Sequence, residues 1–303
     1  MASKLSQSQR RNQRLRERFI ELLLLLAAGS SVFVTLGIVG VLLFESASFF
    51  SHVSLWSFLT DTEWMPLFAE PRFGILPLLC GTLLTTAVAL VVAVPIGLTA
   101  AVYLSEFASP RLREVVKPAL ELLSGVPTVV YGFFALLFVT PLLQTTILPD
   151  LPGFNVLSAG IVIGIMIIPY IASLSEDAMS AVPQGLRDSS LALGATKLET
   201  AFKVVLPAAI SGVAAAVVLG LSRAVGETMV VAIAAGQQPN LTLDPREPAA
   251  TITAFIVQVA LGDLPHGSIG YQSIFAAGLV LFLITLIFSS LSFWMRRRFR
   301  EAY

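Results

Sequence analysis

Residues 182–207, VPQGLRDSSLALGATKLETAFKVVLP, form a polar interruption between two strongly apolar segments of the chain. Residues 188–194 are amphipathic, with neighbouring leucines as apolar contacts, and predict a short helix. Gly194 can then reverse the backbone, since glycine adopts conformations that other residues avoid. A second helix follows and stops at Pro207. A helix–glycine–helix loop of this kind suits docking in the groove of a partner protein, although an ordinary connector shows the same pattern.

The composition of the whole chain excludes an ordinary soluble globule. Of its 303 residues, 56% are hydrophobic and 13% are charged, with a mean hydropathy of +0.85, whereas an average soluble domain carries about 25% charged residues. A transmembrane helix needs about 20 apolar residues, so this length predicts one bundle of about six helices. The stretches long enough to span a bilayer are 19–44, 75–103, 126–144, 157–175, 206–235 and 272–295.

Positive charge is distributed unevenly between the two sides of these spans. All of the 19 Lys and Arg residues lie in the two tails or in the loops near 104–125 and 176–205, except for Arg72, Arg223 and Arg246. These tails and loops share one side, and cytoplasmic loops carry the excess of Lys and Arg. We therefore predict an all-α membrane protein with six transmembrane helices and both termini cytoplasmic. The basic tails are interpreted as topology signals, with no nucleic acid as a partner.

The sequence lacks the patterns of most catalytic and cofactor sites. Cys80 is the single cysteine, and 2 histidines are present, which is too few for a disulfide framework or a thiolate metal site. The chain has no glycine-rich nucleotide loop ending in Gly-Lys-Ser or Gly-Lys-Thr. We predict no catalytic residues, no metal and no cofactor of its own, so any ATP that drives this protein must be bound by another polypeptide.

The stretch LSRAVGETMVV, residues 221–231, places Arg223 and Glu227 inside the fifth span. A charge near the bilayer centre costs about 2.5–3.5 kcal/mol on insertion scales, so a compensating role is expected. Residues four apart share one face of a continuous helix, and the planar guanidinium matches the oxygens of a phosphate-like anion. We interpret Arg223 and Glu227 as a translocation site, with Thr228 as a lesser candidate. The alternative is an ion pair that only locks packing, but buried pairs stabilise poorly.

A second stripe on the same predicted helix consists of small residues at four-residue spacing. Small side chains let helices approach closely in a membrane. The fifth helix is therefore expected to be central and pressed against its neighbours. The stripe comprises Gly212, Ala216, Gly220 and Ala224.

Three segments outside the spans carry further expectations. The first outer loop, residues 45–73, is rich in Phe and Trp, which suit the lipid headgroup level. In the last outer loop, apolar residues from Ile252 onward recur at helical spacing and predict a helix too short to span, which is either interfacial or re-entrant at the outer mouth, or simply packed on the bundle. On the inner side, Glu176 and Asp177 are expected to contact the 182–207 loop or water.

The 182–207 loop resembles the signature of bacterial ABC importer permeases, which reads Glu-Ala-Ala, three residues, Gly, nine residues, Ile-x-Leu-Pro. The corresponding residues here are Asp188, Ser189, Ser190, Gly194, Val204, Leu206 and Pro207. The spacing matches, while Asp replaces Glu and two serines replace the alanines. The resemblance implies that this loop is the coupling helix that enters a cleft of an ATPase subunit.

Three further blocks resemble the phosphate-specific permeases of the PstC type. They are EWMPLFAEPRFGILPLLCGTLLTT, IGLTAAVYLSEFASPRLREVVKPALELLSGVPTVVYGFFAL and SRAVGETMVV. The resemblance implies a type I ABC importer permease fold in the bacterial inner membrane, in contact with lipid. It also implies three partners: a sister permease of the PstA type, a dimer of PstB-type ATPase subunits that binds ATP and magnesium, and an outer phosphate-binding protein of the PstS type. It places an Arg and a Glu of the third block on the phosphate pathway.

The expected organisation follows the spans. It consists of a basic cytoplasmic tail (1–18), a first transmembrane helix with the outer aromatic loop (19–74), a permease core domain (75–295) with the cytoplasmic coupling loop near 180–207, and a second basic tail (296–303). Two alternatives remain open at this point. One is a permease for sulfate or molybdate, and the other is an autonomous secondary transporter that uses Arg223 and Glu227 as a proton relay. The coupling-type loop argues against the second.

The predicted orientation can be tested by labelling single cysteines in a Cys80→Ala background. Cysteines at Ser54 and Asn240 should react with an impermeant thiol reagent added outside, once any outer barrier is permeabilised, because both lie in predicted outer loops. A cysteine at Ser189 should stay unlabelled in intact cells. Labelling at Ser189 without labelling at Ser54 would reverse the orientation.

Overall fold

The computed structural model describes residues 7–66, 68, 70–265 and 267–298, so parts of both predicted tails lie outside the described residues. Five helical stretches are long and apolar enough to cross a membrane, and a sixth is formed if one bent pair counts as a single span. The prediction of six spans is confirmed when the bent pair is counted. These spans are α1 (Gln7–Phe50), α3 with its π-helical turn η1 (Leu76–Val102, Tyr103–Phe107), α5–η2–α6 (Thr128–Phe134, Ala135–Val139, Thr140–Thr146), α7 (Val156–Ser180), the bent pair, and α14 (Ile269–Arg298).

Shorter elements connect the spans and complete the bent pair. Lys197–Ala208 and Ile210–Val225, the two parts of that pair, meet at 74°. They contain α9 (Lys197–Thr200), η3 (Ala201–Val205), α10 (Leu206–Ala208) and α11 (Ile210–Val225). The other short elements are α2 (Leu55–Thr60), strands β1 (Trp64–Met65) and β2 (Arg72–Phe73), α4 (Pro110–Ser124), α8 (Gln184–Ala192), α12 (Met229–Ala234) and α13 (Ile252–Ala260).

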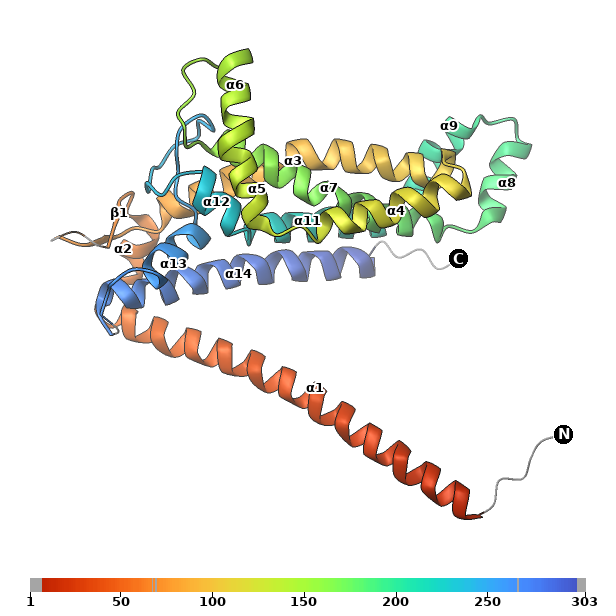
Figure 1. Cartoon of the computed structure of the whole chain (residues 1–303), viewed down its shortest axis with the longest axis horizontal. Coiled ribbons are helices and arrows are strands. Elements are labelled where there is room, and N and C mark those ends of the chain that lie inside the picture. The colour runs from red at the N-terminus through yellow and green to blue at the C-terminus, as the bar shows by residue number, and fades with distance from the viewer. Residues whose placement is uncertain (1–6, 67, 69, 266, 299–303) are drawn as a thin grey trace.

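Figure 1 shows the two ends of the bundle. Helices α8 and α9 lie at one end, which we name the coupling end, and α14 runs toward it. Strand β1 and helices α2 and α13 lie at the opposite end, which we name the hairpin end after the antiparallel pair β1–β2, with Trp64 opposite Phe73. The small hairpin is a minor departure from the all-α prediction.

The centre of the bundle is the contact between α3 and α7. Two glycines on α7 let the helices approach closely: a Cβ atom on Gly160 would lie 2.6 Å from a methyl carbon of Val88, and one on Gly164 would lie 2.8 Å from the carbonyl oxygen of Ala89. Apolar side chains gain no hydrophobic free energy by leaving lipid, so close backbone packing supplies the attraction between membrane helices. The α3–α7 pair is therefore fixed by shape.

The small-residue stripe of α11 packs in the same way. A Cβ atom on Gly220 would lie 2.9 Å from Ile171 of α7, and Gly212 faces Ala178 of the same helix. Ala216 and Ala224 are both buried. The prediction that this stripe presses against a neighbouring helix is confirmed, and the neighbour is α7.

Aromatic residues of the first connecting loop form a core of their own at the hairpin end. Phe49, Phe58, Trp64 and Phe73 are buried and contact one another edge to face, a favourable arrangement for aromatic rings. Trp64 also packs on Phe255 of α13, with ring centroids 4.9 Å apart. These four side chains therefore pack against one another instead of facing outward, while the prediction that the loop lies at the headgroup level stays a prediction.

Helix α13 is present where the spacing from Ile252 predicted it. Its apolar face is buried against the bundle at Ile252, Phe255 and Val259. Of the two predicted arrangements, a helix packed on the bundle is the one observed. Its N-terminus is capped by the side chain of Thr251, which accepts a hydrogen bond from the amide of Ala254.

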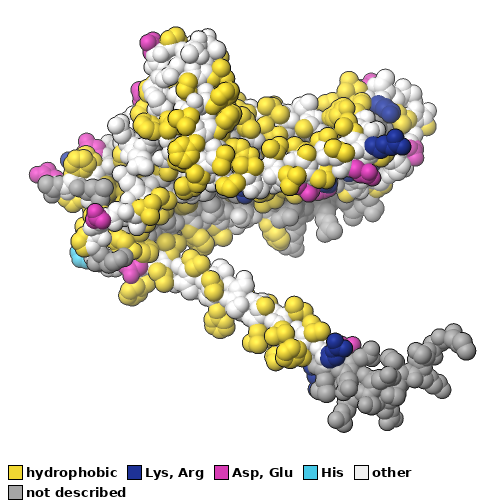
Figure 2. Space-filling model, viewed as in Figure 1, with side chains coloured by type: hydrophobic (Ala, Val, Ile, Leu, Met, Phe, Trp, Pro, Cys, Tyr) yellow, Lys and Arg dark blue, Asp and Glu magenta, His cyan; other side chains and the backbone are white. Residues whose placement is uncertain are grey.

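Helix α1 stands apart from the bundle along most of its length. It packs along α14 near the hairpin end, and Figure 1 shows it diverging from the bundle toward its N-terminus. Its apolar window between residues 16 and 50 is not buried by the rest of the chain. Figure 2 shows this surface covered by hydrophobic side chains, with Lys and Arg near the N-terminal part of the helix. A surface of this kind is suited to lipid or to another membrane protein.

Gly160→Val should destabilise the chain, because the added side chain overpacks the α3–α7 contact. We expect a loss of about 1–3 kcal/mol, read as a lower midpoint of thermal unfolding in detergent. Gly29→Val is the matched control, since Gly29 is also a helical glycine and a Cβ atom added to it would meet nothing within 4 Å. Equal midpoints for the two variants would show that the α3–α7 contact is not close-packed.

Candidate translocation site and coupling loop

The fifth predicted span is interrupted in the middle of the bundle. Helix α11 ends at Val225 and α12 begins at Met229, so residues 226–228 are not helical. The prediction of one continuous helix over 206–235 is wrong, and so is the shared helical face of Arg223 and Glu227. Gly226 stops α11, and Thr228 precedes α12 at its N-cap position. Both are ordinary helix-end residues.

Side chains satisfy the backbone groups that this interruption frees. Glu227 is buried, and its carboxylate accepts hydrogen bonds from the amides of Met229 (3.1 Å) and Val230 (3.3 Å) at the start of α12. The hydroxyl of Thr253 donates to the carbonyl oxygen of Glu227 at 2.6 Å. Thr228 donates to the carbonyl oxygen of Gly226. Irregular backbone within a membrane bundle requires internal partners of this kind.

Arg223 lies in the last turn of α11 and stacks on an aromatic ring. Its guanidinium carbon is 4.3 Å from the ring centroid of Tyr170, a cation–π arrangement. Tyr170 lies near the middle of α7, which runs from Val156 to Ser180. Among the residues that the structure describes, the Nε–H of Arg223 is buried without a hydrogen-bond partner, and Arg223 forms no ion pair with Glu227.

This arrangement can receive an anion. A guanidinium keeps its charge in a nonpolar environment, and it binds oxyanions through short, charge-assisted hydrogen bonds. Tyr170 fixes the plane of the Arg223 side chain, while Glu227 uses its carboxylate on α12. The Nε–H of Arg223 therefore remains without a hydrogen-bond partner among the described residues. Thr228 bonds its own loop.

Cavities at the hairpin end lie away from Arg223. One of about 550 Å³ is lined by Phe154, Ala232, Gly236, Gln237, Gln238 and Pro248, among others, but by neither Arg223 nor Tyr170. Arg223 and Tyr170 therefore lie outside this cavity of the single chain.

The predicted coupling loop forms two helices joined at a glycine. Gly194 has a φ of +87°, which only glycine adopts without strain, so its predicted role in the reversal is confirmed. Asp188 and Ser189 are exposed on α8, and the hydroxyl of Ser190 lies 2.9 Å from that of Thr200. Leu193 is 89% exposed at the tip of the loop.

The second half of the loop forms the predicted second helix, but this helix ends later than predicted. Thr196 and Glu199 form a capping box that starts α9. Leu206 packs against the cluster at the coupling end, and the chain bends at Ala209, two residues beyond the predicted stop at Pro207. Pro207 follows the π-helical turn η3 within the helix Lys197–Ala208, close to its end.

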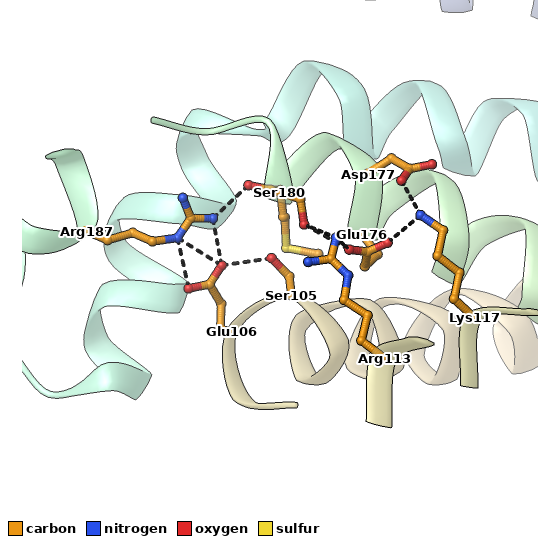
Figure 3. Close-up of polar contacts among 9 residues, drawn as sticks. Ser105, Glu106, Arg113, Lys117, Glu176, Asp177, Ser180 and Arg187 are labelled. Carbon is orange, nitrogen blue, oxygen red and sulfur yellow. Dashed lines mark hydrogen bonds and ion pairs between the residues drawn. The ribbon is translucent and has the colours of Figure 1, made fainter. Parts of the chain in front are cut away.

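Charged residues outside the predicted site form two groups at the coupling end (Figure 3). Arg187 of α8 pairs with Glu106 of η1, with 2.9 Å between Nη2 and Oε1. Buried Glu176 pairs with Arg113 and Lys117 of α4, and Lys117 also pairs with Asp177. The hydrogen bond to Asp177 raises the pKa of Lys117, so its ammonium is charged at neutral pH. These pairs join helices that are distant in sequence.

Neither group was predicted from the sequence, where the basic residues of both counted only as topology signals. The expectation that Glu176 contacts the 182–207 loop or water is wrong, because Glu176 is buried and α4 supplies its partners. Asp177 is 55% exposed, so its predicted contact with water is confirmed, and Lys117 is its additional partner. A carboxylate at the end of a long apolar run, as at Glu106, was the available signal for a buried partner.

Comparisons with known proteins agree with this architecture. The chain matches the family described as "Binding-protein-dependent transport system inner membrane component" over residues 93–301. It is similar to the "Probable ABC transporter permease protein YqgH" of Bacillus subtilis, with 35% identity over 88% of this chain and 84% of that protein. It is also similar to the "Phosphate transport system permease protein PstC" of Mesorhizobium japonicum (35% identity, 90% and 88% covered) and of Pasteurella multocida (36% identity, 78% of each covered).

Solved structures show the same fold at low sequence identity. A bacterial ABC transporter involved in the import of the acidic polysaccharide alginate aligns with a TM-score of 0.64 and 16% identity, covering 96% of this chain and 100% of that chain. An inward-facing MetNI methionine ABC transporter aligns with a TM-score of 0.54 and 19% identity, covering 75% and 95%. The fold is that of the type I ABC importer permeases. This chain belongs to the family of binding-protein-dependent transport system inner membrane components, and it is a multi-pass protein of the inner membrane.

Proposed function

We propose that this chain is the PstC-type permease subunit of an ATP-driven importer of inorganic phosphate. It contributes half of the translocation path and docks an ATPase subunit through α8 and α9. The relatives named as phosphate permeases support the substrate, because they align over most of both chains. The observation that carries the proposal is the buried Nε–H of Arg223, which has no hydrogen-bond partner among the described residues. The guanidinium of Arg223 lies over the ring of Tyr170, near the middle of α7.

Three residues form the substrate site in this proposal. Arg223 binds the anion, because it presents an unused donor and a fixed positive charge. Glu227 caps the start of α12 through two backbone amides and places its carboxyl group beside the interruption. In the proposal this acidic group competes with the anion for Arg223, since transport requires binding that can be released. Thr228 is the lesser candidate because its hydroxyl already bonds within the loop.

The proposal includes the three partners that the resemblance to the PstC-type permeases implies, and exposed surfaces of the single chain support them. A sister permease of the PstA type completes the path beside Arg223. A pair of PstB-type ATPase subunits binds ATP and magnesium and receives the exposed tip of α8 near Leu193. A PstS-type phosphate-binding protein delivers the anion at the hairpin end, which requires that end to face outward and both termini to be cytoplasmic.

Two other functions receive less support. A sulfate or molybdate permease would use similar chemistry at Arg223, but several relatives of this chain are named as phosphate permeases. An autonomous secondary transporter would have no need for a docking loop that turns at a left-handed glycine, Gly194. Pull-down of the tagged chain in mild detergent tests the class: recovery of a second permease and an ATPase is expected.

Gly194→Val should uncouple ATP hydrolysis from the loaded binding protein. The positive φ of Gly194 is strained for a β-branched residue, so the turn between α8 and α9 should distort. We expect stimulation of ATP hydrolysis to fall at least several-fold in the reconstituted complex. Gly29→Val is the matched control, because Gly29 lies in α1, away from the docking loop, with open space around it. Normal stimulation and uptake in the Gly194 variant would contradict the docking role.

A charge-removal series separates phosphate binding from packing at the interruption. Arg223→Gln should reduce phosphate uptake by about ten- to a hundredfold, the loss expected for a charge-assisted hydrogen bond. Arg223→Lys should reduce uptake less and leave folding intact. Glu227→Gln can keep the cap of α12 through its amide oxygen, so it should spare the fold and change release.

The double variant Arg223→Gln with Glu227→Gln removes both charges. If Arg223 binds phosphate, this variant should fold well and still fail to take up labelled phosphate at matched membrane abundance. If the two charges serve packing alone, uptake should return together with stability. Near-wild-type uptake in the double variant would therefore reject Arg223 as a phosphate ligand.

A further inference from the structure

One side chain of the coupling loop reaches into the membrane bundle. Arg187 lies in the middle of α8 and is 12% exposed, while its partner Glu106 is 9% exposed. The guanidinium donates to both carboxylate oxygens of Glu106, with Nη2–Oε1 at 2.9 Å and Nε–Oε2 at 3.2 Å. Paired contacts of this kind are more rigid than a single ion pair, because the guanidinium fork is planar.

The same guanidinium holds two backbone carbonyls at the end of α7. Nη1 donates to the carbonyl oxygen of Val182 at 2.5 Å, and Nη2 donates to that of Met179 at 2.8 Å. Glu106 also accepts a hydrogen bond of 2.8 Å from Ser105. Arg187 therefore ties α8 to the end of α3, through η1, and to the end of α7. Figure 3 shows the guanidinium between these two elements.

Other polar side chains of α8 make only local contacts among the described residues. Gln184 bonds Asp188, and Ser189 bonds the carbonyl oxygen of Gly185, all within α8. Ser190 bonds Thr200 of α9. Arg187 is thus the polar connection between this helix and the α3–α7 pair.

The helices that Arg187 holds lead directly to the anion site. Close packing at Gly160 and Gly164 joins α3 and α7 along their length. Tyr170 of α7 carries the guanidinium of Arg223 on its ring. A displacement of α8 should therefore move α7 and with it Tyr170, because close-packed interiors have low compressibility and transmit strain.

We propose that the Glu106–Arg187 pair is the joint through which movement of the docking loop displaces α3 and α7 and so alters the anion site. Glu106 and Arg187 are positioning residues, and neither touches the transported anion. The proposal rests on the proposed function, since it assumes an ATPase that moves α8. In addition to that function, one side-chain pair transmits the movement of α8 to α3 and α7.

The decisive measurement is the number of anions transported per ATP hydrolysed. The complete complex should be reconstituted in liposomes with its binding protein, for the wild type and for Glu106→Gln, Arg187→Gln and the double variant. We expect each single variant and the double variant to transport at least fivefold fewer anions per ATP. Asp177→Asn is the control, because it removes an ion pair between α7 and Lys117 of α4 that does not involve α8, and it should keep the wild-type ratio.

Stability and transmission are separated by two further comparisons. The double variant removes both buried charges, so assembly should recover relative to the single variants while the ratio stays low. Arg187→Lys keeps the positive charge beside Glu106 but cannot hold Glu106, Met179 and Val182 at once. It should assemble normally and still transport fewer anions per ATP.

A wild-type ratio in Arg187→Lys or in either single variant would overturn the proposal. Recovery of both assembly and ratio in the double variant would also overturn it, because the pair would then serve folding alone. Failure of the proposed function gives a different result: the wild-type complex would transport no phosphate. The ratio would then be measured with sulfate or molybdate, whichever stimulates hydrolysis, and the test of the joint would be unchanged.

Discussion

The structure depends on a constraint that lipid imposes on the backbone: every amide and carbonyl inside the bundle needs an internal partner. The interruption after Val225 meets this constraint by placing a carboxylate and a threonine where the helix stops. These side chains join the interruption to α12 and α13, so α11, α12 and α13 meet at residues 226–228. Arg223 remains beside the interruption with an unused donor. The proposed anion site thus lies where the same interruption of the helix is capped by other side chains.

Two different kinds of contact hold α7, one in its middle and one at the coupling end. In its middle, glycines bring the neighbouring helices close and hold them by shape. At the coupling end, charged side chains of α4 and α8 hold it through Glu176 and through backbone carbonyls. Close packing fixes how near two helices lie, whereas paired hydrogen bonds also fix the orientation of the groups that form them. Helix α7 is therefore closely packed within the bundle and is also held by side chains of α4 and α8 at the coupling end.

The sequence predicts features that depend on spacing along one segment. It locates the spans, the turn at Gly194, the small stripe of α11 and the helix that begins at Ile252, because each is a local pattern. It misses the interruption, since Gly226 and Thr228 are helix-end signals hidden within an apolar run that outweighs them in any window. It also misses Arg187 with Glu106, whose pairing spans 81 positions. Periodicity contains no information about which distant charges meet.

The position of α1 has a consequence for how the protein is made. Its end near Ser48 is fixed by a hydrogen bond of 3.0 Å from Gln272 of α14, 224 positions later in the chain. Among the described helices, α1 is therefore synthesised long before α14, the helix it packs along. At roughly 5–20 residues per second, synthesis of the intervening chain takes on the order of 10 to 50 seconds. During that interval the hydrophobic surface of α1 lacks the helix α14 to pack on. An insertase, a chaperone or another membrane helix can contact this surface in the meantime.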